Sequence, residues 1–383
     1  MSDAPTAQPN EPATPRSIIA SALEQHRNGN LDEAAALYRK ALELEPKNSD
    51  ATRLLGVLAR QQRKFETASE FLHAAVAFNP KSAEAHQDLA LLYFDLRLFS
   101  QAERILERAV KLNPSSPDAW HNLGNTRSAL WDLDRADACF QQTLQLNPEL
   151  AETRRSLEGL QVQRRELEDL TSFFTRLQAR GLGLQSKRNP DSATVPKLDD
   201  RHILPHLLNR IGLVGCGAEI GVQKGRFSEH LLRYWRGTTL YSIDPWRTLA
   251  SHEYVDVANV SQKEHDRFYA DTVRRLKPFK GRSTILRMTS QEAAGQIADR
   301  SLDFCYLDGD HSYEAIRQDI ELWYPKLREG GLLGGHDFVA DGEYEYGSFG
   351  VQRAVKEFVA KANLELVVSN ELELGSWFVI RRR

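Results

Sequence analysis

The feature that most constrains this chain is a repeat of 34 residues in its first half. Helix-breaking and small residues keep this interval through four successive units. They are Pro46, Pro80, Pro114 and Pro148 in one column, Ala34, Ala68, Ala102 and Ala136 in a second, and Ala41, Ala75, Ala109 and Thr143 in a third. A fixed period of this length predicts stacked supersecondary units that bury their apolar faces against one another.

Each unit is predicted to be a pair of helices. Small residues let the two helices approach closely, and the proline ends the second helix before the next unit begins. The period and its columns resemble the tetratricopeptide repeat over about residues 17–150. This resemblance implies an all-α solenoid that holds peptide segments or partner proteins, or mediates self-association. Asn122 and Asn125 either project into its groove or are solvated polar residues.

Composition divides the chain into five segments. Residues 1–16, rich in Pro, Ala and Thr, predict a disordered tail, and residues 17–152 hold the four repeats. Residues 153–182 predict a charged helix that caps the array. Residues 183–200, rich in Gly, Ser, Asn, Pro and Asp, predict a linker. Residues 201–383 then form a second domain.

The overall composition limits the classes of function. Of 383 residues, 27% are charged, and the formal net charge is −3. The lack of a basic excess argues against nucleic acid, and no apolar run approaches the ~20 residues of a membrane helix. The first 16 residues lack the apolar core of a signal peptide. Three distant cysteines, Cys139, Cys216 and Cys305, predict reduced thiols in a cytoplasmic protein.

The second domain opens with a pattern typical of a nucleotide-binding corner. The apolar run Ala218–Val222 predicts a buried strand, which ends in a glycine-bearing loop before a segment with helical periodicity. Gly221 and Gly225 let the backbone approach a ligand, and Glu219 faces the same space. The spacing Glu-x-Gly-x-x-x-Gly differs from the dinucleotide motif Gly-x-Gly-x-x-Gly. It therefore favours a smaller, cationic nucleoside ligand.

An acidic residue ends the next predicted strand. Asp244 lies 23 residues after Gly221, close to the spacing at which an acid binds ribose hydroxyls in α/β nucleoside sites. The alternative is that Asp244 is a turn residue before Pro245. Taken with Glu219 and Gly221, the ribose interpretation is the better one.

Two later strands end in groups that favour metal or acid–base chemistry. An apolar strand from Leu302 ends in Asp308, and the next strand ends in His336 and Asp337. Neighbouring strand tips lie about 5 Å apart, so these side chains are expected to converge. Carboxylates with one imidazole suit Mg²⁺ or Mn²⁺. The alternative is structural: Asp308 caps a loop and His336 only forms hydrogen bonds.

Four motifs in order, EIGV…GRFS, IDPW, DGDHSYE and GGLLGGHDF, resemble class I S-adenosylmethionine-dependent methyltransferases, in the branch of metal-dependent O-methyltransferases. The resemblance covers residues 201–383 and implies a Rossmann-like seven-stranded sheet whose last strand is antiparallel. It implies that S-adenosylmethionine contacts the glycine motif, and that His336 departs from the usual acidic or amide metal ligand. The residues implied for the cofactor are Glu219, Gly221, Gly225, Ser228, Asp244, Ser290, Gln291 and Asp308, with Asp308, His336 and Asp337 for the metal.

The same resemblance carries two expectations that stay open. Ser290 and Gln291 contact adenine, or Ser290 is the N-cap of a helix before Glu292. Asp310 stands where sugar-modifying relatives have their proposed general base, and His311 stands where phenolic relatives have a lysine base. The two residues are expected to act together. The predicted activity is O-methylation of a sugar, glycan or other small metabolite. The alternatives are a protein acceptor recruited by the repeats, or a scaffold without catalysis.

Overall fold

The computed structural model describes residues 14–181, 200–248, 259–344, 347–369 and 374–382. Contacts within the chain divide it into two compact units, Met1–Glu158 and Gly159–Arg383, which are described separately.

Most of the expected N-terminal tail and nearly all of the expected linker lie outside the described residues. Within the described part, no helix has the length and apolar character that crossing a bilayer requires.

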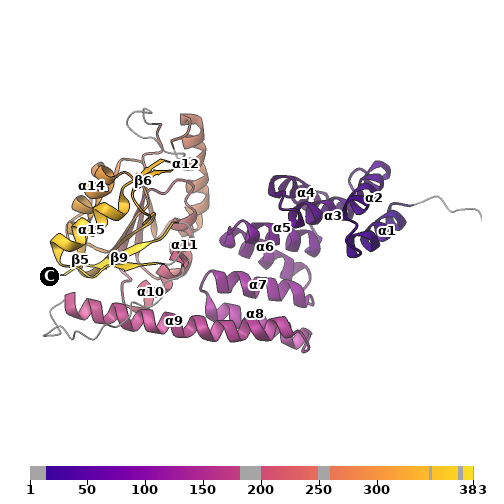
Figure 1. Cartoon of the computed structure of the whole chain (residues 1–383), viewed down its shortest axis with the longest axis horizontal. Coiled ribbons are helices and arrows are strands. Elements are labelled where there is room, and N and C mark those ends of the chain that lie inside the picture. The colour runs from indigo at the N-terminus through magenta and orange to yellow at the C-terminus, as the bar shows by residue number, and fades with distance from the viewer. Residues whose placement is uncertain (1–13, 182–199, 249–258, 345–346, 370–373, 383) are drawn as a thin grey trace, which may run out of the picture. The chain divides into compact units, whose positions relative to one another are not determined.

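The first unit is a row of helical hairpins (Figure 1). Consecutive helices pair in the order of the repeats, which agrees with the predicted all-α solenoid. The helices are α1 (Pro15–Arg27), α2 (Leu31–Leu44), α3 (Ser49–Gln61), α4 (Phe65–Phe78), α5 (Ala83–Asp95), α6 (Phe99–Leu112), α7 (Pro117–Ala129) and α8 (Leu133–Leu146).

The period has a backbone counterpart at the turn inside each hairpin. Gly29, Arg63, Arg97 and Trp131, each 34 residues after the last, adopt φ values of 82°, 58°, 55° and 60°. This left-handed conformation reverses the chain between the two helices of a repeat. The small residues act as predicted: a Cβ added at Gly124 would lie 2.5 Å from Cε1 of Phe140 in the paired helix.

The helix α9 (Ala151–Gly181) contains the division between the two units. Its second half packs on the α/β unit, because the ring of Phe174 lies edge-on to Phe378 at 6.5 Å and Arg180 pairs with Glu365 at 2.9 Å. Gln178 donates a hydrogen bond to the carbonyl oxygen of Gly330 at 3.0 Å. The sequence interpretation of a helix that only caps the repeats misses these contacts.

The second unit is built on a seven-stranded sheet in the order β3-β2-β1-β4-β5-β9-β8. The first five of these strands are parallel, and β9 runs antiparallel to both neighbours, as the sequence predicts. The strands are β1 (Cys216–Ile220), β2 (Thr239–Ile243), β3 (Ser283–Leu286), β4 (Leu302–Leu307), β5 (Leu327–Gly335), β8 (Val367–Val368) and β9 (Trp377–Ile380). A separate hairpin joins β6 (Gly342–Tyr344) to β7 (Gly347–Phe349).

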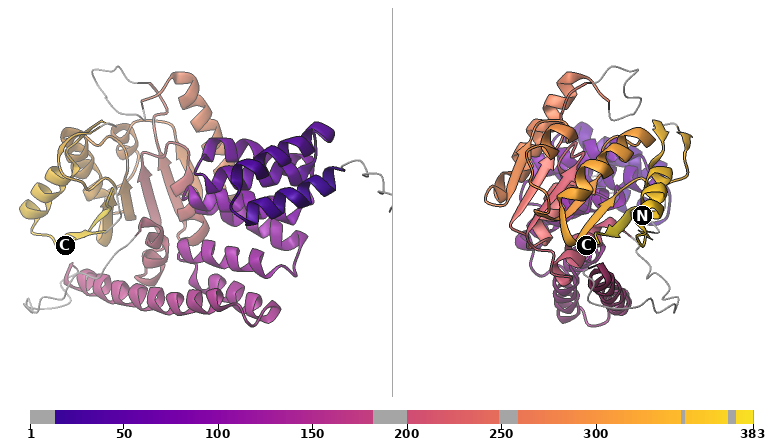
Figure 2. Two further views of the ribbon diagram at one scale, coloured as in Figure 1. Left: turned by 45° about the vertical axis from the view of Figure 1, so that its right-hand side comes forward. Right: turned by 90° about the vertical axis from the view of Figure 1, so that its left-hand side faces the viewer.

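Helices cover the sheet (Figure 2). The alternation along β4 shows that both faces are buried. Cys305 packs in a core cluster with Ile320, whereas Phe304 on the other face lies 4.8 Å from the ring of Trp235. Burial on both faces explains why β4 is apolar from Phe304 to Leu307. The helices are α10 (Leu204–Arg210), α11 (Arg226–Tyr234), α12 (Gln262–Leu276), α13 (Ser290–Ala294), α14 (Tyr313–Trp323) and α15 (Val351–Ala362), with short 3-10 turns η1 (Arg201–Ile203), η2 (Lys277–Phe279) and η3 (Tyr324–Lys326).

The register of the sheet determines where the site forms. Ile220 pairs with Ile243 and Leu307, and Leu307 pairs with Gly335. The residues that follow these four therefore stand side by side at one edge of the sheet: Gly221, Asp244, Asp308 and His336.

Candidate functional site

A cavity of about 710 Å³ opens at this edge of the sheet. Most of the residues predicted from the sequence lie in its wall. They are Glu219, Gly221, Asp244, Ser290, Gln291, Asp308, Asp310, His311, His336 and Asp337.

Two predicted residues, Gly225 and Ser228, are not part of the cavity wall among the described residues. Gly225 has φ 67° at the start of α11, and a Cβ there would lie 2.8 Å from Cγ2 of Thr272. Ser228 is fully buried and donates a hydrogen bond to the carboxyl of Glu219. Both residues therefore pack behind the loop, and a contact of either with the cofactor stays a prediction.

Glu219 is a buried acid at the end of β1. Its side chain borders the cavity, yet only 1% of the residue is exposed. Burial raises the pKa of Glu219 to about 8, and the hydrogen bond from Ser228 opposes this only in part. The carboxyl is therefore largely protonated at neutral pH, and a cation beside it would favour its ionised form.

Asp244 braces the glycine loop. Its Oδ2 accepts hydrogen bonds from the backbone N–H of Val222 at 3.1 Å and of Gln223 at 2.8 Å, and Oδ1 accepts one from Trp246 at 2.7 Å. Burial raises its pKa, although these three bonds act in the opposite direction. Asp244 therefore organises a turn and also borders the cavity, and its contact with a ribose stays a prediction.

Ser290 differs from its alternative interpretation as a helix cap. The N-cap of α13 is Thr289, which forms a reciprocal capping box with Glu292. Ser290 instead donates a hydrogen bond to Asp319 and accepts one from the indole Nε1 of Trp323 at 2.8 Å.

Asp308 lies between two basic groups. Its Oδ2 is 2.8 Å from Nη1 of Arg201, and its Oδ1 is 3.7 Å from Nδ1 of His336. The guanidinium of Arg201 also stacks over the ring of Phe227 at 5.0 Å. A direct ion pair thus already compensates the charge of the predicted metal ligand.

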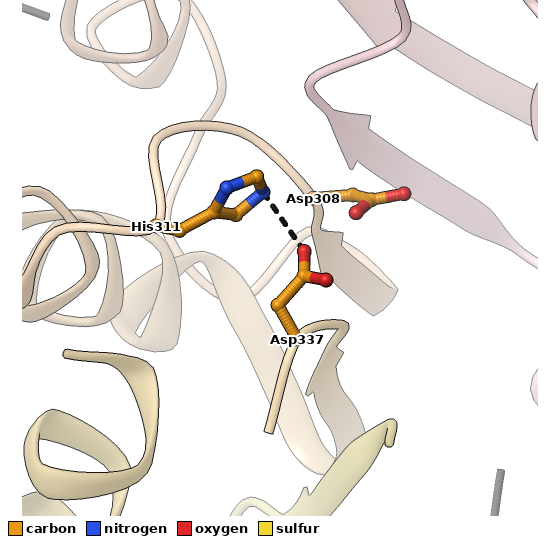
Figure 3. A group of neighbouring side chains, drawn as sticks. All are labelled: Asp308, His311 and Asp337. Atoms are coloured by element: carbon orange, nitrogen blue, oxygen red, sulfur yellow. Dashed lines mark ion pairs between the residues drawn. The ribbon is translucent and has the colours of Figure 1, made fainter. Parts of the chain in front are cut away.

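Asp337 accepts from two imidazoles. Its Oδ2 is 2.8 Å from Nε2 of His311 (Figure 3), and its Oδ1 is 3.0 Å from Nδ1 of His336. Although burial acts to raise its pKa, these two hydrogen bonds hold the pKa of Asp337 well below its usual range. Asp337 also has φ 59°, a strained conformation for a residue with a side chain, and such strain is typical of functional sites.

The group of side chains that could hold a metal differs from the predicted one. Asp308, His311 and Asp337 offer ligand atoms that all lie within 4.8 Å of one another (Figure 3). His311 joins this group because its Nε2 lies 2.8 Å from Oδ2 of Asp337, and a metal role for His336 stays a prediction. His336 instead bridges the two carboxylates from the side.

The imidazole of His311 is held on a second side by the β6–β7 hairpin. The ring of Phe349 stacks on it at 4.9 Å with an interplanar angle of 9°. Asp310, its predicted partner, borders the cavity and accepts the backbone N–H of Ser312 at 2.8 Å. Asp310 therefore orders the loop that carries His311.

Sequence reasoning missed Arg201, Asp319 and Phe349. Arg201 is 107 residues from Asp308, and nothing in its neighbourhood marks it as a site residue. Asp319 lies within an amphipathic helix, where a charged residue is usually solvated. Only the tertiary fold brings these residues to the strand ends.

In the repeats, the side chain of Asn125 forms hydrogen bonds with other residues of the first unit. Its amide lies 2.9 Å from Nε2 of His121, and its oxygen accepts a hydrogen bond from Ser156 at 3.2 Å. A separate cavity of about 550 Å³ is bordered by α1, α3 and the start of α5, with Leu23, Arg53 and Lys81 in its wall.

Comparison with known families divides the chain in the same two parts. A family model described as a methyltransferase domain matches residues 218–338. Models described as tetratricopeptide repeat match residues 25–92, 59–125 and 117–150.

The matching proteins are distant from this chain in sequence. The uncharacterized protein y4gI of Sinorhizobium fredii is 26% identical over 139 residues, a match that covers 35% of this chain and only 14% of that protein. Among solved structures, pilF of Pseudomonas aeruginosa is 22% identical with a TM-score of 0.38, covering 51% of this chain and 83% of its own. The MamA protein is 23% identical with a TM-score of 0.35, covering 39% and 82%.

Proposed function

The chain joins tetratricopeptide repeats to a methyltransferase domain, and we propose that this domain uses S-adenosylmethionine to methylate a hydroxyl group of a sugar, glycan or other small metabolite. One observation carries the proposal. A single cavity contains both the acidic strand ends suited to a cationic nucleoside, Glu219 and Asp244, and the imidazole–carboxylate pair of His311 and Asp337.

The donor would lie along the ends of β1, β2 and β3. Asp244 would accept from the ribose hydroxyls, and Glu219 would face the positive charge of the methionine part. Ser290 and Gln291 would contact the adenine. Gly221 supports this placement of the donor. Its φ is 85° and it lies against the backbone of Asp308, so no side chain stands between the ends of β1 and β4 at this point.

The reaction would be an in-line displacement. The bond from the methyl carbon to the sulfonium sulfur breaks as a bond to the acceptor oxygen forms, so the products are S-adenosylhomocysteine and a methyl ether. The acceptor proton would pass to His311. The protein's main task is to align donor and acceptor, which lowers the entropic part of the activation barrier.

The surroundings of His311 suit a general base. Its Nε2–H donates to Asp337, so in the neutral ring Nδ1 is the nitrogen that carries the lone pair. Asp337 also stabilises the imidazolium that forms after proton transfer, as a carboxylate does in other imidazole–carboxylate pairs. Asp310 would act with His311 by holding its loop in place.

A divalent cation is the second component that the resemblance implies. Two carboxylates and an imidazole fit Mg²⁺ or Mn²⁺, and Asp308, His311 and Asp337 would hold the ion. It would supply a Lewis acid that lowers the pKa of the acceptor hydroxyl. Arg201 already neutralises Asp308, however, and imidazoles already satisfy Asp337. We therefore expect transfer to proceed without the ion.

The repeats are proposed to bind a protein partner or to mediate self-association. The mixed apolar and charged wall of their cavity, with Leu23 beside Arg53 and Lys81, supports a peptide segment as the occupant. A cytoplasmic location is proposed from the three cysteines, each of which is a free thiol.

The test is to incubate the purified full chain with methyl-labelled S-adenosylmethionine and cell extract, with and without EDTA. The extract is then separated into small molecules, glycans and proteins. We expect label in small molecules or glycans, unaffected by EDTA, and none with Asp244→Ala. Asp299→Ala is the matched control, because this carboxylate is exposed and lies outside the cavity wall.

Other outcomes would contradict parts of the proposal. Label in the protein fraction would assign a protein acceptor recruited through the repeats. Loss of transfer with EDTA, restored by Mg²⁺ or Mn²⁺, would assign the strand-end carboxylates to a metal. Donor binding without any transfer would leave a non-catalytic scaffold.

A further inference from the structure

Asp319 is a buried carboxylate in the cavity wall for which the proposed reaction has no use. It lies on α14, and 8% of the residue is exposed. Ser290 donates a hydrogen bond to its Oδ1, and the indole N–H of the buried Trp323 donates to Ser290 at 2.8 Å. The chain of donors therefore runs from Trp323 through Ser290 to Asp319.

The protons carried by Ser290 and Asp319 determine which hydrogen bonds this pair of side chains can offer a ligand. A serine hydroxyl has one proton, and Ser290 gives it to Asp319. One of its acceptor positions receives the N–H of Trp323, so what remains on Ser290 is acceptor capacity. An ionised carboxylate is an acceptor only. The side chains of Ser290 and Asp319 therefore offer a ligand hydrogen-bond acceptors and no hydrogen-bond donor.

Among the described residues, no positively charged side chain compensates the negative charge of Asp319. Within the described part of the chain, no arginine, lysine or histidine forms an ion pair with Asp319. Burial raises its pKa to about 6, and the nearby Asp310 acts in the same direction. A buried carboxylate with one hydroxyl partner is costly to the fold. That cost is understandable if a ligand donates the missing hydrogen bond.

We propose that Asp319 and Ser290 select the adenine base by accepting hydrogen bonds from its exocyclic amino group. This inference rests on the proposed use of S-adenosylmethionine. Hypoxanthine has a carbonyl oxygen in place of that amino group, so its oxygen would face two acceptors with no proton between them. A site built to pair one polar group rejects an analogue that lacks it far more strongly than an apolar pocket does.

The test compares two probes by calorimetry: S-adenosylhomocysteine and S-inosylhomocysteine, which differ in the group on C6 (amino in one, carbonyl in the other) and in the proton that hypoxanthine carries on N1. The full chain is expected to prefer the adenine form by on the order of 100-fold. In Asp319→Asn, the amide oxygen can still accept from Ser290, so the amide nitrogen replaces the second acceptor with a donor. This variant is expected to bind S-inosylhomocysteine more tightly than the wild type does, narrowing the preference at least tenfold.

The gain for one ligand separates recognition from damage to the fold, since a destabilised variant would lose both. Glu314→Gln is the matched control on the same helix, because its side chain is 75% exposed and lies outside the cavity wall. It is expected to keep the full preference. An unchanged ratio in Asp319→Asn would overturn the inference and leave Asp319 a structural contact between α13 and α14. If neither ligand binds the wild type, the proposed cofactor itself is wrong.

Discussion

At the scale of single residues, the site depends on acids that the fold keeps in unusual protonation states. Glu219 is the clearest example, because burial raises its pKa to about 8 while Ser228 supplies its hydrogen-bond donor. The cationic donor would stabilise the carboxylate form. Ligand binding should therefore expel the proton that the free protein carries at neutral pH.

S-adenosylhomocysteine keeps the ammonium group of the donor. We expect its binding to make the protein release close to one proton per molecule bound at pH 7. Calorimetry in phosphate and in Tris measures this release, because the two buffers differ in ionisation enthalpy. Glu219→Gln should bind more weakly and release no proton. An equal release by the variant would place the proton on another group.

The same pKa gives a stability prediction of definite sign. Because the folded-state pKa of Glu219 exceeds its unfolded value of 4.5, the folded protein binds the extra proton between about pH 4.5 and 8. The free energy of unfolding therefore falls as pH rises through this window. Glu219→Gln should lose part of that decline, and thermal melts at pH 6 and pH 9 would measure the difference.

Residues directly after strands are those that sequence alone can place. Asp244 and Asp308 each follow a recognisable apolar run, so their meeting at one sheet edge needs only the parallel topology. Arg201 and Asp319 cannot be placed in this way, because their neighbours at the site are distant in sequence and set by helix packing. The closeness of His311 to Asp308 and Asp337 depends on the path of the loop between β4 and α14, which the sequence pattern does not specify.

At the scale of elements, two glycines from the conspicuous motifs have different roles. Gly221 has φ 85°, and a Cβ there would lie 2.0 Å from the backbone oxygen of Asp308. Gly309 has no positive φ, and its nearest contact would be Cγ2 of Ile220 at 3.9 Å. Of these two glycines, the structure requires only Gly221.

We therefore expect Gly221→Ala to reduce the free energy of unfolding by more than about 3 kcal/mol, since the β1 and β4 ends must separate and the backbone is strained. Gly309→Ala should change it by less than about 1 kcal/mol. Urea denaturation followed by circular dichroism measures both. Gly281→Ala is the control, because a Cβ there meets nothing within 4 Å. Equal losses at the two motif glycines would contradict this account.

At the scale of the whole molecule, the domain boundary suggested by composition differs from the one that contacts suggest. The expected linker, residues 183–200, follows α9, whereas the compact α/β unit begins at Gly159 within that helix. The buried residues Leu167, Leu170, Phe174 and Leu177 recur at helical spacing and so share one face of α9. Charge on the opposite face is what made this helix resemble a solvated cap.

We propose that the α/β unit needs the second half of α9 to fold stably. A fragment that starts at residue 195 would leave Phe378 without the ring of Phe174 and Gly330 without the hydrogen bond from Gln178. Burying one such aromatic side chain stabilises by about 1.5–3 kcal/mol, a large part of the 5–15 kcal/mol typical of a domain. We expect residues 159–383 to be soluble with a cooperative thermal transition, and residues 195–383 to melt at least 10 °C lower or to aggregate.

The melting temperature of Phe174→Ala in the longer fragment should lie between those of the two fragments. Thr175→Ala, on the exposed side of the helix, should leave the melting temperature unchanged. Equal melting temperatures for the two fragments would show that α9 is an appendage and return the boundary to the linker.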